Sequence, residues 1–172
     1  ANGRTTAMIS ASENWKEINF RNNTDKTTLY ISGRCFFANG HSVTEIADNT
    51  AKNNLPLQKY LLYGKTLATD ILANGKQIKV SAATNFNSML LETSPSNKIK
   101  LEVNNQMPVF GISLESPEGI IVDNFSFRGN SGTDFVKMDT TFLKSITANH
   151  TYDLIVLQYG VNIFGKATDE NF

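Results

Sequence analysis

Residues 69–80 read Thr69-Asp70-Ile71-Leu72-Ala73-Asn74-Gly75-Lys76-Gln77-Ile78-Lys79-Val80, two short runs of apolar and β-branched residues joined by Asn74-Gly75. A two-residue turn of type I′ needs a positive φ at both central positions, and Asn followed by Gly is the pair that best tolerates it. In the second run, Ile78 and Val80 alternate with Lys79, which is typical of a strand with one buried face. This stretch therefore predicts a β-hairpin.

The same pattern of short strands extends over residues 1 to about 112. Proline punctuates the loops at Pro95 and Pro108. Many short antiparallel strands at this spacing indicate a β-sandwich, of jelly-roll-like form, for residues 1–112. The runs rich in β-branched or aromatic residues are 14–21, 27–32, 58–63, 69–73, 77–82, 88–92, 98–103 and 109–114.

The pattern changes near residue 119. Gly119–Val122 begins a nearly continuous apolar run, Asp134–Ala148 has the apolar period of a helix, and Leu154–Leu157 is a second apolar run. A strand, a helix and a strand in this order predict one right-handed βαβ unit with parallel strands buried on both faces. Such a unit needs more sheet than residues 113–172 supply, so we expect cover from the β region or from another polypeptide segment.

Composition excludes several classes of protein. The 172 residues include sixteen basic and sixteen acidic side chains, so the net charge is zero and no broad positive field for nucleic acid is implied. The single cysteine, Cys35, cannot form an internal disulfide and reads as a buried apolar residue. No metal cluster or cofactor motif is recognisable. No apolar run reaches the roughly 18 residues of a transmembrane helix, and no signal-peptide pattern is recognisable in these residues.

Two hydrogen-bond donors follow the predicted parallel strands. Gly129 lies in a Gly-rich turn after the first strand, and Asn162 follows the second in the string Gly160-Val161-Asn162. A glycine presents its backbone N–H unobstructed, and an asparagine amide donates without titrating. Each residue alone reads as an ordinary turn or loop residue. Together, at the ends of neighbouring strands, they favour a site that stabilises an oxyanion.

The residues around these donors carry a family resemblance. Asn124–Thr133 and Tyr152–Asn162 resemble the second and third signature blocks of the SGNH (GDSL-like) hydrolases, which are α/β esterases with a flavodoxin-like sheet. The resemblance implies that Gly129 and Asn162 donate to the oxyanion. It also implies a partial flavodoxin-like segment at 113–172. Ile163 stands where the third block usually has an aspartate, a difference that bears on the fine positioning of the oxyanion donors.

A narrower resemblance concerns the junction between the two parts. Residues 110–115 leading into 119–124 look like the exit from a carbohydrate-binding-module-like β-sandwich that is inserted into exported Bacteroidetes SGNH proteins. This resemblance implies a secreted, periplasmic or cell-surface lipoprotein. It implies a parent enzyme that removes an acyl group, such as acetyl, from a glycan through an acyl-serine intermediate.

The catalytic blocks of that family are absent from the chain. Neither a Gly-Asp-Ser string nor an Asp-x-x-His string occurs, and His41 and His150 read as exposed loop histidines. The chain is therefore interpreted as an inactive fragment whose partners are the remaining segments of the parent hydrolase and its acylated glycan substrate. The alternatives are a non-catalytic carbohydrate-binding module and a structural or adhesion domain. In a binding module, Trp15 and Tyr63 are the first candidates for exposed sugar-stacking rings, whereas most aromatic residues of this region are expected to fill the core.

Overall fold

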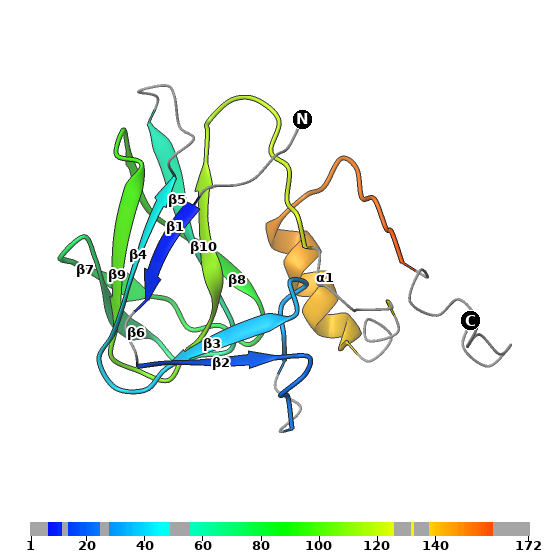
Figure 1. Ribbon diagram of the computed structural model, residues 1–172, viewed down its shortest axis with the longest axis horizontal. Helices are drawn as coiled ribbons and strands as arrows, with labels where there is room; N and C mark the ends of the chain where they lie inside the picture. The colour runs from blue at the N-terminus through cyan, green and yellow to red at the C-terminus, as the bar shows by residue number, and fades with distance from the viewer. Residues whose placement is uncertain are drawn as a thin grey trace, which may run out of the picture.

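The computed structural model describes residues 7–11, 14–24, 28–48, 56–125, 132 and 138–159. Within these ranges the chain forms two five-stranded sheets in which every pairing is antiparallel (Figure 1). The predicted β-sandwich is confirmed. Sheet A has the order β1 (Ala7–Ala11), β4 (Ser42–Asp48), β9 (Lys98–Val103), β6 (Thr69–Ala73) and β7 (Lys76–Val80). Sheet B has the order β2 (Trp15–Asn19), β3 (Arg34–Ala38), β10 (Pro108–Glu115), β5 (Leu57–Tyr63) and β8 (Asn87–Ser94).

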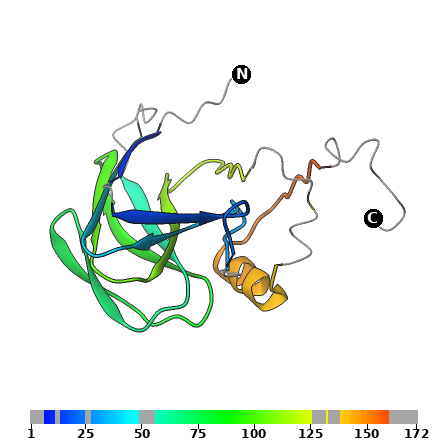
Figure 2. The ribbon, with the colours of Figure 1, turned by 60° about the horizontal axis from the view of Figure 1, so that its bottom comes forward.

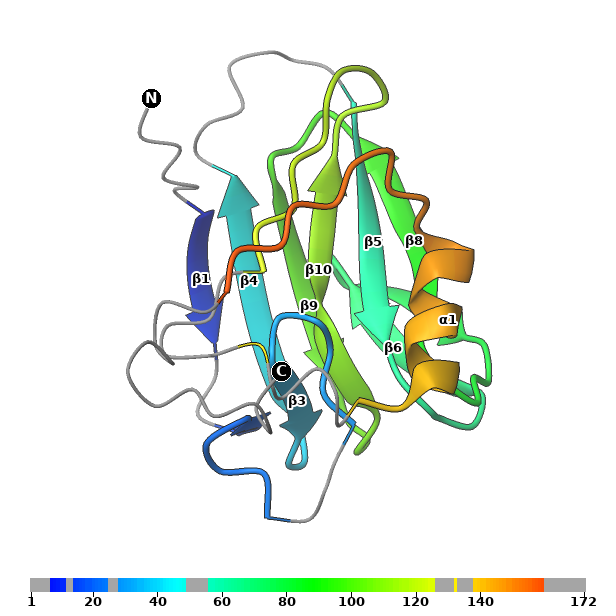
Figure 3. The ribbon, with the colours of Figure 1, turned by 90° about the vertical axis from the view of Figure 1, so that its right-hand side faces the viewer.

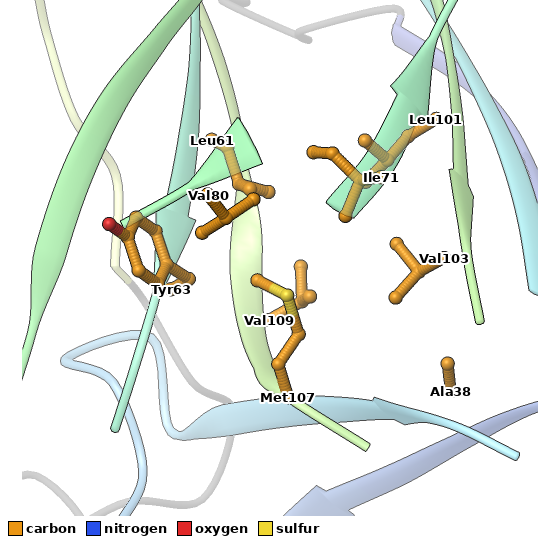
Figure 4. Close-up of a cluster of buried hydrophobic side chains, with 9 residues drawn as sticks. All are labelled: Ala38, Leu61, Tyr63, Ile71, Val80, Leu101, Val103, Met107 and Val109. Atoms are coloured by element: carbon orange, nitrogen blue, oxygen red, sulfur yellow. The ribbon is translucent and has the colours of Figure 1, made fainter. Parts of the chain in front are cut away.

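The two sheets enclose a core, called the inner core, to which both contribute apolar side chains (Figure 4). Along β5, Leu61 and Tyr63 alternate with outward-facing residues and are fully buried. Burial of apolar area here supplies the main favourable term for the sandwich. The inner core comprises Ala38, Leu61, Tyr63, Ile71, Val80, Leu101, Val103, Met107 and Val109.

A second core, called the outer core, lies on the other face of sheet B under helix α1 (Thr140–Asn149). Figures 1 and 2 place α1 beside sheet B and away from sheet A, so the molecule has three layers. The helix contributes Phe142 and Ile146, one turn apart on the same face. The outer core comprises Ile18, Leu29, Tyr30, Cys35, Phe86, Phe110, Phe142 and Ile146.

Most predicted strands agree with the structure to within a few residues. The hairpin forms as expected, with φ of 50° at Asn74 and 77° at Gly75 between β6 and β7. One prediction is wrong: residues 28–32 form no strand and instead place Leu29 and Tyr30 in the outer core. Three strands were not predicted, namely β1, β3 and β4.

The flavodoxin-like βαβ segment is also wrong. Among the described residues after β10, the one regular element is α1, and neither Gly119–Val122 nor Leu154–Leu157 forms a strand. Their side chains are exposed, with 94% of Ile120 and 78% of Leu154 accessible. An apolar run matches a doubly buried strand only where neighbouring strands cover it, and the described chain offers none beside these runs.

The predicted helix is shorter than its apolar period suggested. It begins at Thr140, after Asp139 caps it by accepting a hydrogen bond from the backbone N–H of Thr141 at 2.7 Å. Met138 is not helical, and residues 133–137 lie outside the described chain. Within the described ranges, no helix is long and apolar enough to cross a membrane.

One charged side chain enters the interior between the sheets. Lys59 on β5 is fully buried, and its Nζ donates to Glu92 Oε1 at 2.5 Å and to Ser94 Oγ at 2.6 Å on β8. Partial burial of Glu92 would raise its pKa. Hydrogen bonds from Lys59, Asn74 and Ser94 outweigh that effect and hold the pKa of this carboxyl below its ordinary value.

We expect Ile146→Ala to lower the free energy of unfolding by about 2–5 kcal/mol, because it removes a fully buried anchor of α1 from the outer core. Lys144→Ala, on the exposed side of the same helix, is the matched control and should change stability by less than about 0.5 kcal/mol. Urea denaturation of both variants measures the difference. Equal losses would show that α1 is not anchored through this face.

The ion pair predicts a dependence of stability on pH. Since the pKa of folded Glu92 is lowered from 4.5, its contribution is present above that value and is lost as the pH falls through the folded pKa. Lys59→Met removes the pair, so this variant should lose less stability than the wild type between about pH 5 and pH 3. Urea denaturation at both pH values, with exposed Lys98→Met as control, checks this. The same pH dependence in Lys59→Met and wild type would contradict it.

Candidate functional site

The two predicted oxyanion donors, Gly129 and Asn162, lie outside the described residues. Their nearest described neighbours in the sequence are Gly132 and Tyr159, and these two residues are in contact. An ideal Cβ on Gly132 would lie 2.9 Å from Cγ of Tyr159, closer than real Cβ atoms approach a ring carbon. Gly132 also has a φ of +90°, which L side chains rarely adopt. Only glycine fits this close approach.

A second contact joins the same two parts of the chain at positions earlier in the sequence. The Tyr152 hydroxyl donates to Oδ2 of Asp123 at 3.1 Å. Residue 123 therefore meets 152, and 132 meets 159, so the two contacts occur in the same order along both segments. In Figures 1 and 3, residues 116–125 and 151–159 both lie on the outward side of sheet B, the side that carries α1.

Tyr30 lies beneath these segments, in the loop before β3. It is 3% exposed, and its ring centroid lies 5.3 Å from that of Phe86, 5.5 Å from that of Phe110 and 5.5 Å from that of Phe125. Its hydroxyl is hydrogen-bonded to that of Tyr152. Burial, with the nearby charge of Asp123, raises the pKa of Tyr152 to about 12, and burial raises the pKa of Tyr30 further. Both phenols are therefore neutral hydrogen-bonding groups at neutral pH.

Within the described part of the chain, neither histidine lies beside a nucleophile for which it could act as a base. His41 is exposed and lies on the sandwich, with its Nε2 3.1 Å from Oε2 of Glu102. His150 follows α1 and is half-buried, which differs from the exposed loop position expected of it. Its ring packs near Phe86 and Tyr152, and within the described chain its buried Nε2 has no hydrogen-bond partner.

Three further features of the described residues, a thiol, possible metal ligands and a surface depression, show no catalytic arrangement. Burial raises the pKa of the Cys35 thiol to about 12, so it stays protonated and inert at neutral pH. Across the described ranges, no three His, Cys, Asp or Glu side chains gather where they could hold a metal ion. A surface depression of about 480 Å³ has Lys65 as its one ionisable lining residue, so it contains no acid–base pair. Its other lining residues are Thr66, Leu67, Ala82, Ala83 and Thr84.

The two sugar-stacking candidates lie in different places. Tyr63 is fully buried in the inner core, and its hydroxyl donates to the Ser81 carbonyl at 3.2 Å, so its ring presents no face to a ligand. Tyr63 therefore fills the core, as expected of most aromatic residues in this region, and is not an exposed candidate. Trp15 is half-buried, and its indole N–H donates to the Val43 carbonyl at 3.2 Å.

Sequence reasoning missed the roles of Tyr30, Asp123 and Tyr152. Tyr152 begins one of the two quoted motifs and Asp123 directly precedes the other, but a hydrogen bond across 29 positions leaves no periodic signal. The sequence predicts a strand around Tyr30, where the alternation of side chains along the strand would decide to which face its ring points. Its actual place in a loop gives it contacts from several directions.

We expect His150→Phe to keep or increase stability by about 1 kcal/mol, because a buried nitrogen without a partner costs free energy that a phenyl ring avoids. His41→Phe is the control, and it should bring no gain since its Nε2 already faces Glu102. Thermal unfolding of both variants compares them. A marked loss of stability in His150→Phe would show that this nitrogen has a partner elsewhere in the chain.

The sequence matches no protein-family model and no curated protein. Among solved structures, the fold is similar to that of a peptidoglycan O-acetylesterase, with a TM-score of 0.73 and 18% sequence identity. The match covers 95% of this chain and 45% of that protein, so the chain spans less than half of the esterase. At this level of identity the comparison establishes a shared fold over the matched region.

Proposed function

We propose that this chain is part of a serine ester hydrolase that removes an acyl group, such as acetyl, from a glycan. Gly129 and Asn162 hold the tetrahedral oxyanion that forms when a serine attacks the acyl carbonyl. The sugar oxygen then leaves with a proton, and water releases the acid from the acyl-serine. The observation that carries the proposal is the contact between Gly132 and Tyr159, which lie three residues from Gly129 and from Asn162.

The nucleophile and the base come from polypeptide beyond these 172 residues. Two observations support this part of the proposal. First, more than half of the similar esterase lies outside the matched region. Second, the chain exposes two apolar runs on the side of sheet B that carries both motifs, and exposed apolar surface of this kind marks a contact region. The exposed residues are Ile120, Ile121, Val122, Leu154, Ile155, Val156 and Leu157.

The family resemblance and the similar structure support the proposed substrate class. The similar structure is a peptidoglycan O-acetylesterase, and an acyl ester on a glycan fits the same type of reaction. Such a substrate places the enzyme outside the cytoplasm, as a secreted, periplasmic or lipid-anchored protein. In this arrangement the β-sandwich is an accessory domain that supports one side of the site.

A non-catalytic carbohydrate-binding module has less support. Sugar-binding platforms need exposed aromatic faces, whereas Tyr63 is fully buried and the Trp15 indole nitrogen is bonded within the sandwich. Glycan binding to the isolated chain would nevertheless be a clear result in its favour.

We expect the full polypeptide that carries this chain to release acetate from O-acetylated peptidoglycan or from p-nitrophenyl acetate. Asn162→Ala should lower kcat by about 10²–10³ with little change in KM, since an oxyanion donor acts mainly in the transition state. Asn104→Ala, at an exposed loop position after β9, is the matched control and should leave kcat unchanged.

Two results would count against this function. The first is a full polypeptide that folds but releases no acetate from either substrate. The second is an Asn162→Ala variant with wild-type kcat. The 172-residue chain by itself should give no turnover, because oxyanion donors without a nucleophile do not form an acyl-enzyme.

A further inference from the structure

We infer that Tyr30 is a positioning residue. Through it the β-sandwich fixes the two segments that lead to Gly129 and Asn162, and Tyr152 links Tyr30 to Asp123. The inference rests on the proposed function for what those segments do. It rests on described contacts alone for the claim that Tyr30 holds them together.

Tyr30 contacts both segments with different parts of its side chain. Its ring packs edge-on against Phe125, at a centroid distance of 5.5 Å and an interplanar angle of 85°. Its hydroxyl is hydrogen-bonded to Tyr152. Phe125 lies four residues before Gly129, and Tyr152 lies ten before Asn162. One side chain of the sandwich therefore touches both approaches to the proposed site.

The two hydrogen bonds run in one direction, from Tyr30 through Tyr152 to Asp123. The Tyr152 hydroxyl donates its proton to Oδ2 of Asp123, so its oxygen is left to accept from Tyr30. Asp123 is exposed and accepts at the outer end of this chain, and Glu115 is a second nearby carboxylate. Each of these hydrogen bonds joins two different parts of the polypeptide, so it restrains their relative position.

The sandwich itself holds Tyr30 rigidly. The ring stacks against Phe86, in the loop before β8, and against Phe110 on β10, which also stack on each other at 6.1 Å. The backbone N–H donates to the Arg34 carbonyl at 3.2 Å. A buried aromatic ring in such a cluster has few rotamers open to it. Tyr30 is therefore a fixed point to which two segments without strand hydrogen bonds are attached.

Such a fixed point matters for a site assembled from two loops. Oxyanion donors act only when they already point at the charge that develops, and a misplacement of about 1 Å can cost on the order of 10² in rate. The Gly132–Tyr159 contact sets the far ends of the segments, and the Tyr30–Tyr152–Asp123 chain sets their near ends.

The first experiment measures the distance between the segments in the present chain. Spin labels are attached at Ile121→Cys and Ile155→Cys, which are exposed, while buried Cys35 with its raised thiol pKa stays unlabelled. Electron paramagnetic resonance then gives the distribution of distances between the labels. We expect a narrow distribution that broadens in Tyr152→Phe and in Tyr30→Phe, because each loses a hydroxyl but keeps its ring.

The matched control is Tyr60→Phe. The Tyr60 hydroxyl bonds Gln58 within sheet B at 3.2 Å and links no second segment, so its loss should leave the distribution narrow. Asp123→Asn keeps an acceptor for Tyr152 and should broaden the distribution less than Asp123→Ala does. Distributions that stay as narrow in Tyr152→Phe and Tyr30→Phe as in Tyr60→Phe would overturn the inference.

The second experiment measures kinetics in the full polypeptide. Tyr30→Phe should lower kcat roughly 10-fold with KM unchanged, since misplaced donors affect the transition state more than substrate binding. Broadened distances with wild-type kcat would overturn the positioning role. Broadened distances in a polypeptide that shows no esterase activity at all would overturn the proposed function and leave the tether established, so the two failures are distinguishable.

Discussion

The structure depends on a sheet that is apolar on both of its faces. Along β10, Val109 enters the inner core and the next residue, Phe110, enters the outer core. Along β5, Leu61 and Tyr63 face inward while Leu62 packs outward. A sheet of this kind is stable only if both faces are covered. Sheet A covers one face, and α1 with the aromatic rings around Tyr30 covers the other.

The outer cover connects the sandwich to the two motifs. Helix α1 lies in the sequence between residues 116–125 and 151–159, so docking the helix also brings the ends of both segments to the same side of sheet B (Figure 3). The ring of Phe142 packs edge-on against Phe86 and Phe110, the rings that also hold Tyr30. Packing of the helix and placement of the segments therefore use the same aromatic residues.

The sequence predicts local features well where one cause decides them. Asn74-Gly75 fixes a hairpin because backbone conformation alone selects those residues, and β9 alternates cleanly because one face is buried. Tertiary context decides the rest. Strand β3, with Cys35 and Phe36 on opposite faces, has apolar residues on both sides, so it shows no alternation to detect. Tyr63 and Trp15 are both aromatic residues of sheet B, yet packing buries only the first completely.

Dependence on tertiary context also explains why the apolar runs at 119–122 and 154–157 do not form the buried strands that the sequence predicts. An apolar run predicts burial, but it does not say which polypeptide provides the cover. Here the runs flank the contacts between Asp123 and Tyr152 and between Gly132 and Tyr159, so the segments are held in place while their apolar side chains face outward. Exposed Val and Leu side chains on tethered segments are what a contact surface requires. The tether at Tyr30 and the proposed contact with further polypeptide are thus two parts of one arrangement, in which the sandwich presents the segments and the proposed further polypeptide covers them.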